Sequence, residues 1–288
     1  MIKNTKQKEK DMTVVLKKRG RPSKADVAAR SVKSVPVRPD AEILTDLKER
    51  FSILSILTKG AVAKNVRAVT VTGAPGVGKS YTVEQILGSG NTPHEIIKGA
   101  ISAVNLYKTA YRMRKAGSVI VLDDADSLFN DEDALNILKV LCDSSETRKV
   151  SWMKESNALI ADDVPQSFEF CGAMIFISNL DFQRFVDEGK NKYAQHFEAL
   201  MSRSLYLDLR LHSRNELGVW IEHVASAGKI FEREGLTTAQ GKAVLSFLKK
   251  HRDDLRELSL RTLLKAAQLV KTNTNWENMA RVLLLKTR

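Results

Sequence analysis

A glycine-rich loop at residues 73–80 restricts the folds open to this chain. The segment Gly73-Ala-Pro-Gly-Val-Gly-Lys79-Ser80 fits the pattern G-x-x-x-x-G-K-[ST] and lies between a β-branched run at 66–72 and a helical pattern at 79–87. Glycines let consecutive amides turn toward phosphate oxygens, and the helix N-terminus adds partial positive charge. Lys79 would contact the β- and γ-phosphates, and Ser80 would ligate Mg²⁺. The predicted nucleotide-binding residues are Gly73, Ala74, Pro75, Gly76, Val77, Gly78, Lys79, Ser80 and Tyr81.

A second strand ends in carboxylates. The apolar run at 118–122 is followed by Asp123 and Asp124. Beside a phosphate loop, Asp123 would hold Mg²⁺ through water, and Asp124 would orient or deprotonate the attacking water. The alternative is a strand followed by an acidic helix cap, which involves no catalysis.

Strand and helix patterns alternate along the middle of the chain. Further strands are expected at 94–97, 173–178 and 205–211, and helices at 104–115 and 133–141. Asp40 is expected to cap a first helix, and only helices are expected after about residue 213. The predicted fold class is α/β, with a parallel-sheet nucleotide-binding domain over 40–212 and a small helical lid domain over 213–288.

Three further segments resemble the AAA+ family of P-loop ATPases over roughly residues 40–275. Ile175-Phe-Ile-Ser178-Asn179 resembles the sensor 1 strand, which implies that Asn179 lies beside the γ-phosphate. Ala199-Leu-Met-Ser202-Arg203-Ser204 looks like the Ser-Arg segment of clamp loaders, whose arginine reaches a neighbouring subunit's nucleotide. Leu258-Ser-Leu-Arg261 looks like the sensor 2 helix, so Arg261 would fold over the nucleotide. The resemblance implies the catalytic set Asp124, Asn179, Arg203 and Arg261, with ATP and Mg²⁺ bound. Taken singly, Arg203 and Arg261 also fit solvated surface charges.

Two departures from the family pattern bear on function. AAA+ ATPases usually have Asp-Glu where this chain has Asp123-Asp124, and the shorter aspartate predicts slower turnover. The chain also lacks the Arg-Pro-Gly-Arg-Phe element of protein unfoldases, and Lys98-Gly99-Ala100 offers no aromatic grip on a threaded polypeptide. Both absences count against a protein unfoldase.

The first forty residues carry most of the net charge. They hold twelve Lys and Arg against four Asp and Glu, a net of +8 out of +12 for the whole chain. Residues 1–39 are expected to be a disordered basic tail. Within 17–24, Arg19, Gly20, Arg21 and Pro22 match an AT-hook-like core that would enter a narrow A·T minor groove. A nuclear-import signal or a solubilising extension would look the same.

Other features exclude several classes of protein. Cys142 and Cys171 are too few for a disulfide framework, and they favour a reducing cytoplasm. The N-terminus lacks a secretory signal, and no apolar run approaches the roughly 20 residues that span a bilayer. Trp152, in a basic stretch, could stack on nucleic-acid bases, but burial in a hairpin is favoured. Tyr107 and Tyr111 are expected to pack within a helix.

The combined interpretation is an ATP-hydrolysing AAA+ protein acting on DNA as a loader, initiator or recombination-type ATPase. It would assemble as a homo-oligomeric ring or filament, and it is reminiscent of ATPases of tailed bacteriophages, which would place it in a host cytoplasm. One alternative is an ATP-dependent DNA-binding filament or switch with slow turnover. Another is a protein remodeller tethered to DNA by its tail.

Overall fold

The computed structural model of the chain describes residues 38–189, 193–211 and 213–287. From Pro39 onward the chain forms one compact unit. The basic segment with Arg19, Gly20, Arg21 and Pro22 lies outside the described residues, so the predicted DNA contact stays a prediction.

Helix α2 (Asp40–Val62) opens the compact unit, and its first turn differs from the expectation. The N-cap is Pro39, with φ −59° and ψ 141°, and its carbonyl accepts hydrogen bonds from the amides of Glu42 and Ile43. The prediction that Asp40 is the cap is therefore wrong by one residue. Asp40 instead lies in the first turn with Glu42, where negative charge interacts favourably with the helix dipole.

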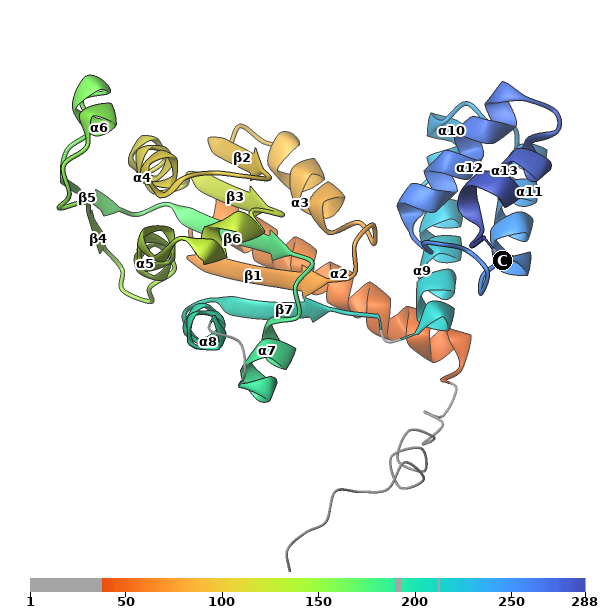
Figure 1. Ribbon diagram of the computed structural model, residues 1–288, viewed down its shortest axis with the longest axis horizontal. Helices are drawn as coiled ribbons and strands as arrows, with labels where there is room; N and C mark the ends of the chain where they lie inside the picture. The colour runs from red at the N-terminus through yellow and green to blue at the C-terminus, as the bar shows by residue number, and fades with distance from the viewer. Residues whose placement is uncertain (1–37, 190–192, 212, 288) are drawn as a thin grey trace, which may run out of the picture. The chain divides into compact units, whose positions relative to one another are not determined.

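A five-stranded parallel sheet forms the centre of the unit (Figure 1). Its order is β2 (His94–Lys98), β3 (Val119–Asp123), β6 (Ala173–Ser178), β1 (Ala68–Gly73) and β7 (Leu205–Leu209). Every residue of the three central strands is buried. Strands that are buried along their whole length require cover on both faces of the sheet.

Helices supply that cover on each side. Residues of α2 and α3 (Lys79–Gly88) pack on one face, against alternate residues of β1, β3 and β6. The other face packs against α4 (Ala103–Arg112), α5 (Glu132–Leu141) and α8 (Ala194–Arg203). The short η1 (Asp126–Asn130) and α7 (Phe182–Glu188) add the rings of Phe129 and Phe182 to this second cluster.

A small antiparallel hairpin, whose strand bounds the sequence patterns did not give, lies between α5 and β6. It consists of β4 (Arg148–Ser151) and β5 (Ser167–Phe170), with α6 (Asn157–Ala161) between them. Trp152 follows β4, is only 9% exposed, and lies with its ring 5.9 Å from that of Tyr107. Burial of Trp152 in a hairpin is confirmed, and so is the packing of Tyr107, whose ring also contacts Phe168.

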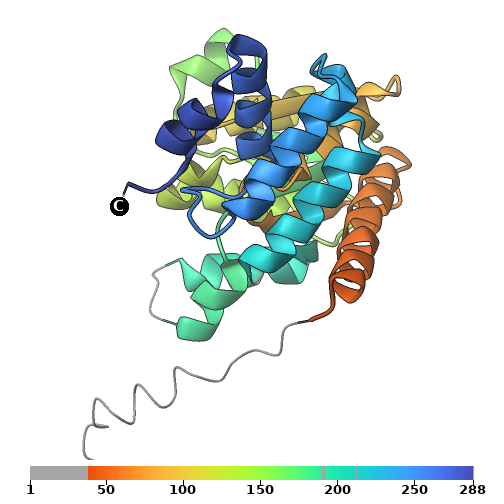
Figure 2. The ribbon, with the colours of Figure 1, turned by 90° about the vertical axis from the view of Figure 1, so that its right-hand side faces the viewer.

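The C-terminal part is helical. It contains α9 (Arg214–Ala227), α10 (Ile230–Arg233), α11 (Thr238–Lys250), α12 (Leu260–Thr272) and α13 (Trp276–Leu284), which share an apolar cluster of their own. Figure 2 shows α9 beside α2, where Trp220 stacks on Phe51 with 4.3 Å between ring centroids. No helix in the described ranges has the length and hydrophobicity needed to cross a membrane.

The predicted fold class, α/β with a parallel-sheet domain followed by helices, is confirmed by this architecture. The domain boundary at 212/213 stays a prediction.

Candidate nucleotide-binding site

The glycine-rich loop connects the carboxyl end of β1 to α3, as the motif predicts. Gly78 caps α3 with φ +106°, and Gly76 has φ +69°, both in the left-handed region that favours glycine. Gly76 is also crowded, because a Cβ atom placed on it would lie 2.7 Å from Cβ of Ser259. Backbone conformation and close contact therefore both require glycine at position 76.

Lys79 is held inside this loop. Its side chain is 5% exposed, and Nζ donates to the carbonyl oxygens of Gly73 at 2.8 Å and Ala74 at 2.9 Å and to Oδ1 of Asn179 at 2.8 Å. Burial lowers the pKa of Lys79 to about 8, although the nearby carboxylates of Asp124 and Asp123 oppose this shift. Lys79 is thus a buried cation whose pKa of about 8 lies close to neutral pH.

Ser80 and Asp123 form the second part of the site. The hydroxyl of Ser80 donates to Oδ1 of Asp123 at 2.9 Å, and burial raises the pKa of the Asp123 carboxyl. A hydroxyl and a carboxylate oxygen at this separation fit Mg²⁺, which usually takes one or two protein ligands and completes its shell with water and phosphate. Among the described residues, no cluster of three or more His, Cys, Asp or Glu side chains is placed to hold a metal ion.

Asp124 and Asn179 meet across two strands. The Nδ2 group of Asn179 donates to Oδ1 of Asp124 at 2.7 Å, and both side chains are exposed. Asp124 has φ +53°, in the left-handed region, and its amide donates to the carbonyl of Ile177. A non-glycine residue in this conformation is strained, and such strain is concentrated at functional sites. Asn179 therefore contacts both Lys79 and Asp124, so the structure brings these three predicted residues together.

Asp126 supports this arrangement and was not predicted as a site residue. Its Oδ1 accepts a hydrogen bond from the hydroxyl of Ser178 at 2.7 Å, and the same hydroxyl accepts from the amide of Leu180. Burial raises the pKa of Asp126. The pair joins the segment after β3 to the end of β6, directly before Asn179. The sequence offered one indication of this role, because Asp126 is the third aspartate in Asp123-Asp124-Ala-Asp126.

The N-terminus of α12 lies against the loop. The amide of Leu260 donates to the carbonyl of Gly76 at 2.9 Å, and Cγ of Arg261 is 3.5 Å from the Cβ position of Gly76. Ser259 caps the helix by accepting from the amide of Thr262. Arg261 is exposed and close enough to Lys79 to lower the pKa of that lysine. The structure thus places Arg261 beside the loop, and its role over a bound nucleotide stays a prediction.

Two further contacts join the C-terminal helices to the loop and to α3. The indole Nε1 of Trp220 donates to the carbonyl of Val77 at 2.9 Å in a buried setting. Tyr81, which is 51% exposed, accepts a hydrogen bond at its hydroxyl from Arg233. Trp220 was not predicted as a site residue, because only the folded chain brings it to a loop that lies 143 positions away.

Arg203 lies at the amino ends of the strands, on the side of the sheet opposite to the glycine-rich loop. It ends α8, just before the amino end of β7, whereas the loop follows the carboxyl end of β1, where Gly73 pairs with Leu209. The four steps from Leu205 to Leu209 alone span about 13 Å at the usual rise of a parallel strand. Arg203 is therefore not part of its own chain's loop site, and its predicted role in a neighbouring subunit stays a prediction.

Comparison with known proteins gives one relative by sequence. No protein-family model matches the chain. It is 36% identical over 263 residues to the "Uncharacterized 36.7 kDa protein in nrdC-mobD intergenic region" of Enterobacteria phage T4, an alignment that covers 89% of this chain and 80% of that protein. The chain belongs to the family of this phage T4 protein.

Two solved structures are similar in fold to this member of the phage T4 protein family. The RuvB Holliday junction branch migration motor of Thermotoga maritima is 14% identical, with TM-score 0.45, and the match covers 83% of this chain and 68% of that one. NtrX of Brucella abortus in complex with ADP is 13% identical, with TM-score 0.47, over 87% of this chain and 54% of that one.

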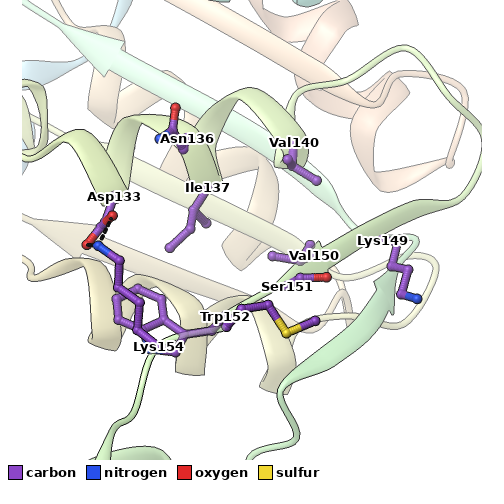
Figure 3. Close-up of a pocket in the computed structure, with 10 residues that line it drawn as sticks. Asp133, Asn136, Ile137, Val140, Lys149, Val150, Ser151, Trp152 and Lys154 are labelled. Carbon is purple, nitrogen blue, oxygen red and sulfur yellow. Dashed lines mark hydrogen bonds and ion pairs between the residues drawn. The ribbon is translucent and has the colours of Figure 1, made fainter.

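The present chain has a separate cavity between α5 and the β4–β5 hairpin (Figure 3). Its volume is about 290 Å³, and its lining includes Trp152 and the ion pair between Lys154 and Asp133, with N and O 2.7 Å apart. None of its lining residues belongs to the glycine-rich loop or to the predicted catalytic set. The cavity is therefore distinct from the candidate nucleotide site.

Proposed function

We propose that this chain binds ATP with Mg²⁺ and hydrolyses it, as an AAA+ ATPase that works as a homo-oligomer. One observation carries the proposal: polar groups from the ends of three adjacent strands meet at one edge of the sheet. Lys79 follows β1, the pair Asp123 and Asp124 follows β3, and Asn179 follows β6. Hydrogen bonds of 2.7 to 2.9 Å connect Lys79 to Asn179, Asn179 to Asp124, and Ser80 to Asp123.

Each group has a distinct part in this proposal. The three N–H donors of Lys79 are directed to two loop carbonyls and to Asn179, so a phosphate oxygen would replace at least one of these acceptors. The buried ammonium would then stabilise charge that develops on the terminal phosphate. The exposed carboxylate of Asp124 would orient the attacking water and accept its proton.

Ser80 and Asp123 are the groups that would hold Mg²⁺. When bound, the ion supplies neutralisation of phosphate charge. Asp123 is buried and its pKa is raised by that burial, so a neighbouring dication would favour its ionised form.

The direct test compares two lysines at the same edge of the sheet. Lys79→Ala should abolish binding of a fluorescent ATP analogue and all hydrolysis. Lys98→Ala is the matched control, because Lys98 ends β2 at the same end of the sheet, is exposed, and pairs with Glu84. Retained nucleotide affinity in folded Lys79→Ala protein would overturn the assignment of the site.

We also propose that the ATPase acts on DNA, in a phage-infected host cytoplasm. The support is the basic tail with Arg19, Gly20, Arg21 and Pro22, and the family relation to a phage T4 protein. The experiment measures the ATPase rate with and without double- and single-stranded DNA. A rate indifferent to both, for the full chain, would argue against DNA as the substrate.

A second candidate function is an ATP-dependent DNA-binding switch with slow turnover. It is favoured by Asp124, which is shorter than the glutamate usual at this position and whose Oδ1 is already bonded to Asn179. This candidate predicts that particles assemble on DNA in a non-hydrolysable ATP analogue while turnover is negligible. Steady DNA-stimulated hydrolysis would contradict it.

A further inference from the structure

A second arginine, Arg67, lies with Arg203 at the amino ends of the strands. Strands β1 and β7 run parallel, with Val69 opposite Leu205 at their amino ends. Arg67 directly precedes β1, and Arg203 precedes β7 by one residue, Ser204. The hydroxyls of Thr70 and Ser204, 2.7 Å apart, join the two strands close to this edge. Because paired strands lie about 4.8 Å apart, the two arginines start from neighbouring backbone positions.

Both guanidinium groups reach the turn that follows α5. Nη1 of Arg67 donates to the carbonyl of Ser144 at 2.6 Å. Nε of Arg203 lies 3.8 Å from Oδ2 of Asp143, and Nη1 of Arg203 donates to the carbonyl of Ala199. A guanidinium has five N–H donors, so these contacts leave each arginine with donors for a further anion.

The surroundings of the two arginines suit a contact between copies of the chain. Arg67 is exposed, the side chain of Arg203 is 37% exposed, and the apolar side chain of Leu205 beside them is 50% exposed. At the other edge of the sheet, Asp124 and Asn179 are also exposed, so the proposed position of the terminal phosphate is open to a neighbouring molecule. Two cationic side chains at one exposed surface favour an anionic partner there.

We infer that Arg67 and Arg203 together bind the terminal phosphate of a nucleotide held in a second copy of this chain. The inference rests on the proposed ATPase function and adds Arg67, which no sequence motif indicated, to the groups that act between subunits. Planar guanidinium groups suit this role because they bind phosphate oxygens through paired N–H donors.

The test is a mixing experiment with full-length protein. Arg67→Ala should lower kcat roughly 10- to 100-fold, the loss expected for one hydrogen bond to a charged group, and should leave its own ATP affinity unchanged. Arg67→Lys, which keeps the charge but not the fork, should fall between Arg67→Ala and wild type. Arg184→Ala is the control, because Arg184 is an exposed arginine on α7 that pairs with Glu188. It should keep the wild-type rate.

Mixing then separates a role between subunits from a structural role. Arg67→Ala mixed with Asp124→Asn should regain activity, because some interfaces pair an intact arginine with an intact acidic site. No recovery at any ratio, with mixed assembly confirmed by crosslinking, would overturn the inference. A wild-type rate for Arg67→Ala, with Arg203→Ala inactive, would overturn it while leaving the proposed function standing. Absence of ATP hydrolysis by the wild-type protein would overturn both.

Discussion

Raising the pH from 7 to 9 should weaken ATP binding through a single group, Lys79. Burial lowers the pKa of this lysine to about 8, and it is 5% exposed behind the loop. Phosphate contacts favour the charged lysine, so the nucleotide complex keeps the proton to higher pH than the free protein does. Above pH 8, binding must therefore take up a proton, and affinity falls as that proton becomes scarce.

The magnitude follows from the pKa. At pH 7 about nine tenths of the free protein carries a charged Lys79, and at pH 9 about one tenth does, so the dissociation constant should rise about tenfold. The same shift has the opposite effect on the free protein. Its unfolded chain keeps the proton up to pH 10.5, so the contribution of Lys79 to stability rises between pH 8 and 10.5.

The assay is a titration with a fluorescent ATP analogue at constant ionic strength between pH 7 and 9.5. Lys98→Ala should keep the slope, because Lys98 is exposed and its hydrogen bond with Glu84 raises its pKa. Lys79→Ala should give weak binding without the slope. A wild-type dissociation constant that stays constant across this range would refute the argument that a buried Lys79 contacts the phosphates.

The remaining predictions concern the acidic residue, the contact behind the loop, and the tail. Asp124→Asn should still bind ATP and lose roughly 10²–10⁴-fold in hydrolysis rate, the usual contribution of a general base. Asp124→Glu should raise turnover, because the longer side chain reaches as far as the glutamate usual at this position. A wild-type hydrolysis rate in Asp124→Asn would exclude Asp124 as the base. Trp220→Phe leaves the buried carbonyl of Val77 without its donor, so it should lower the free energy of unfolding in urea by about 1–3 kcal/mol. Trp220→Ala should lower it by about 3–5 kcal/mol. Equal stability of Trp220→Phe and wild type would show that the hydrogen bond is dispensable. Deletion of residues 1–39 should leave the basal ATPase intact and flatten the salt dependence of DNA binding by roughly 0.9 in slope for each lost phosphate contact. Arg21→Ala should remove A·T preference in a duplex competition, and equal binding of A·T-rich and G·C-rich duplexes by the full chain would contradict an AT-hook.

Much of the sheet was predictable because β3 and β6 are nearly continuous apolar runs and β1 is rich in β-branched residues. The expected strand 173–178 matches β6, and the expected helix 133–141 is α5 with one more residue at its start. Elements with weak patterns were not delimited. Strands β4 and β5 have only four residues each, and α7 has seven. Short amphipathic segments of this kind owe their structure to packing rather than to propensity.

Within the candidate site, local chemistry and tertiary structure determined different features. The sequence predicts the glycine-rich loop with Lys79 and Ser80, and the paired aspartates. A glycine turn between a strand and a helix has few conformations, and its amides and lysine are suited to binding phosphate. The contact of Lys79 with Asn179 across 100 positions, the hydrogen bond from Trp220 to the loop, and the shared edge of Arg67 and Arg203 required the folded chain. Motifs are read from neighbouring residues, whereas these contacts depend on the order of strands in the sheet and on the packing of helices against it. Only the sum of many weak apolar contacts across the whole core determines that order.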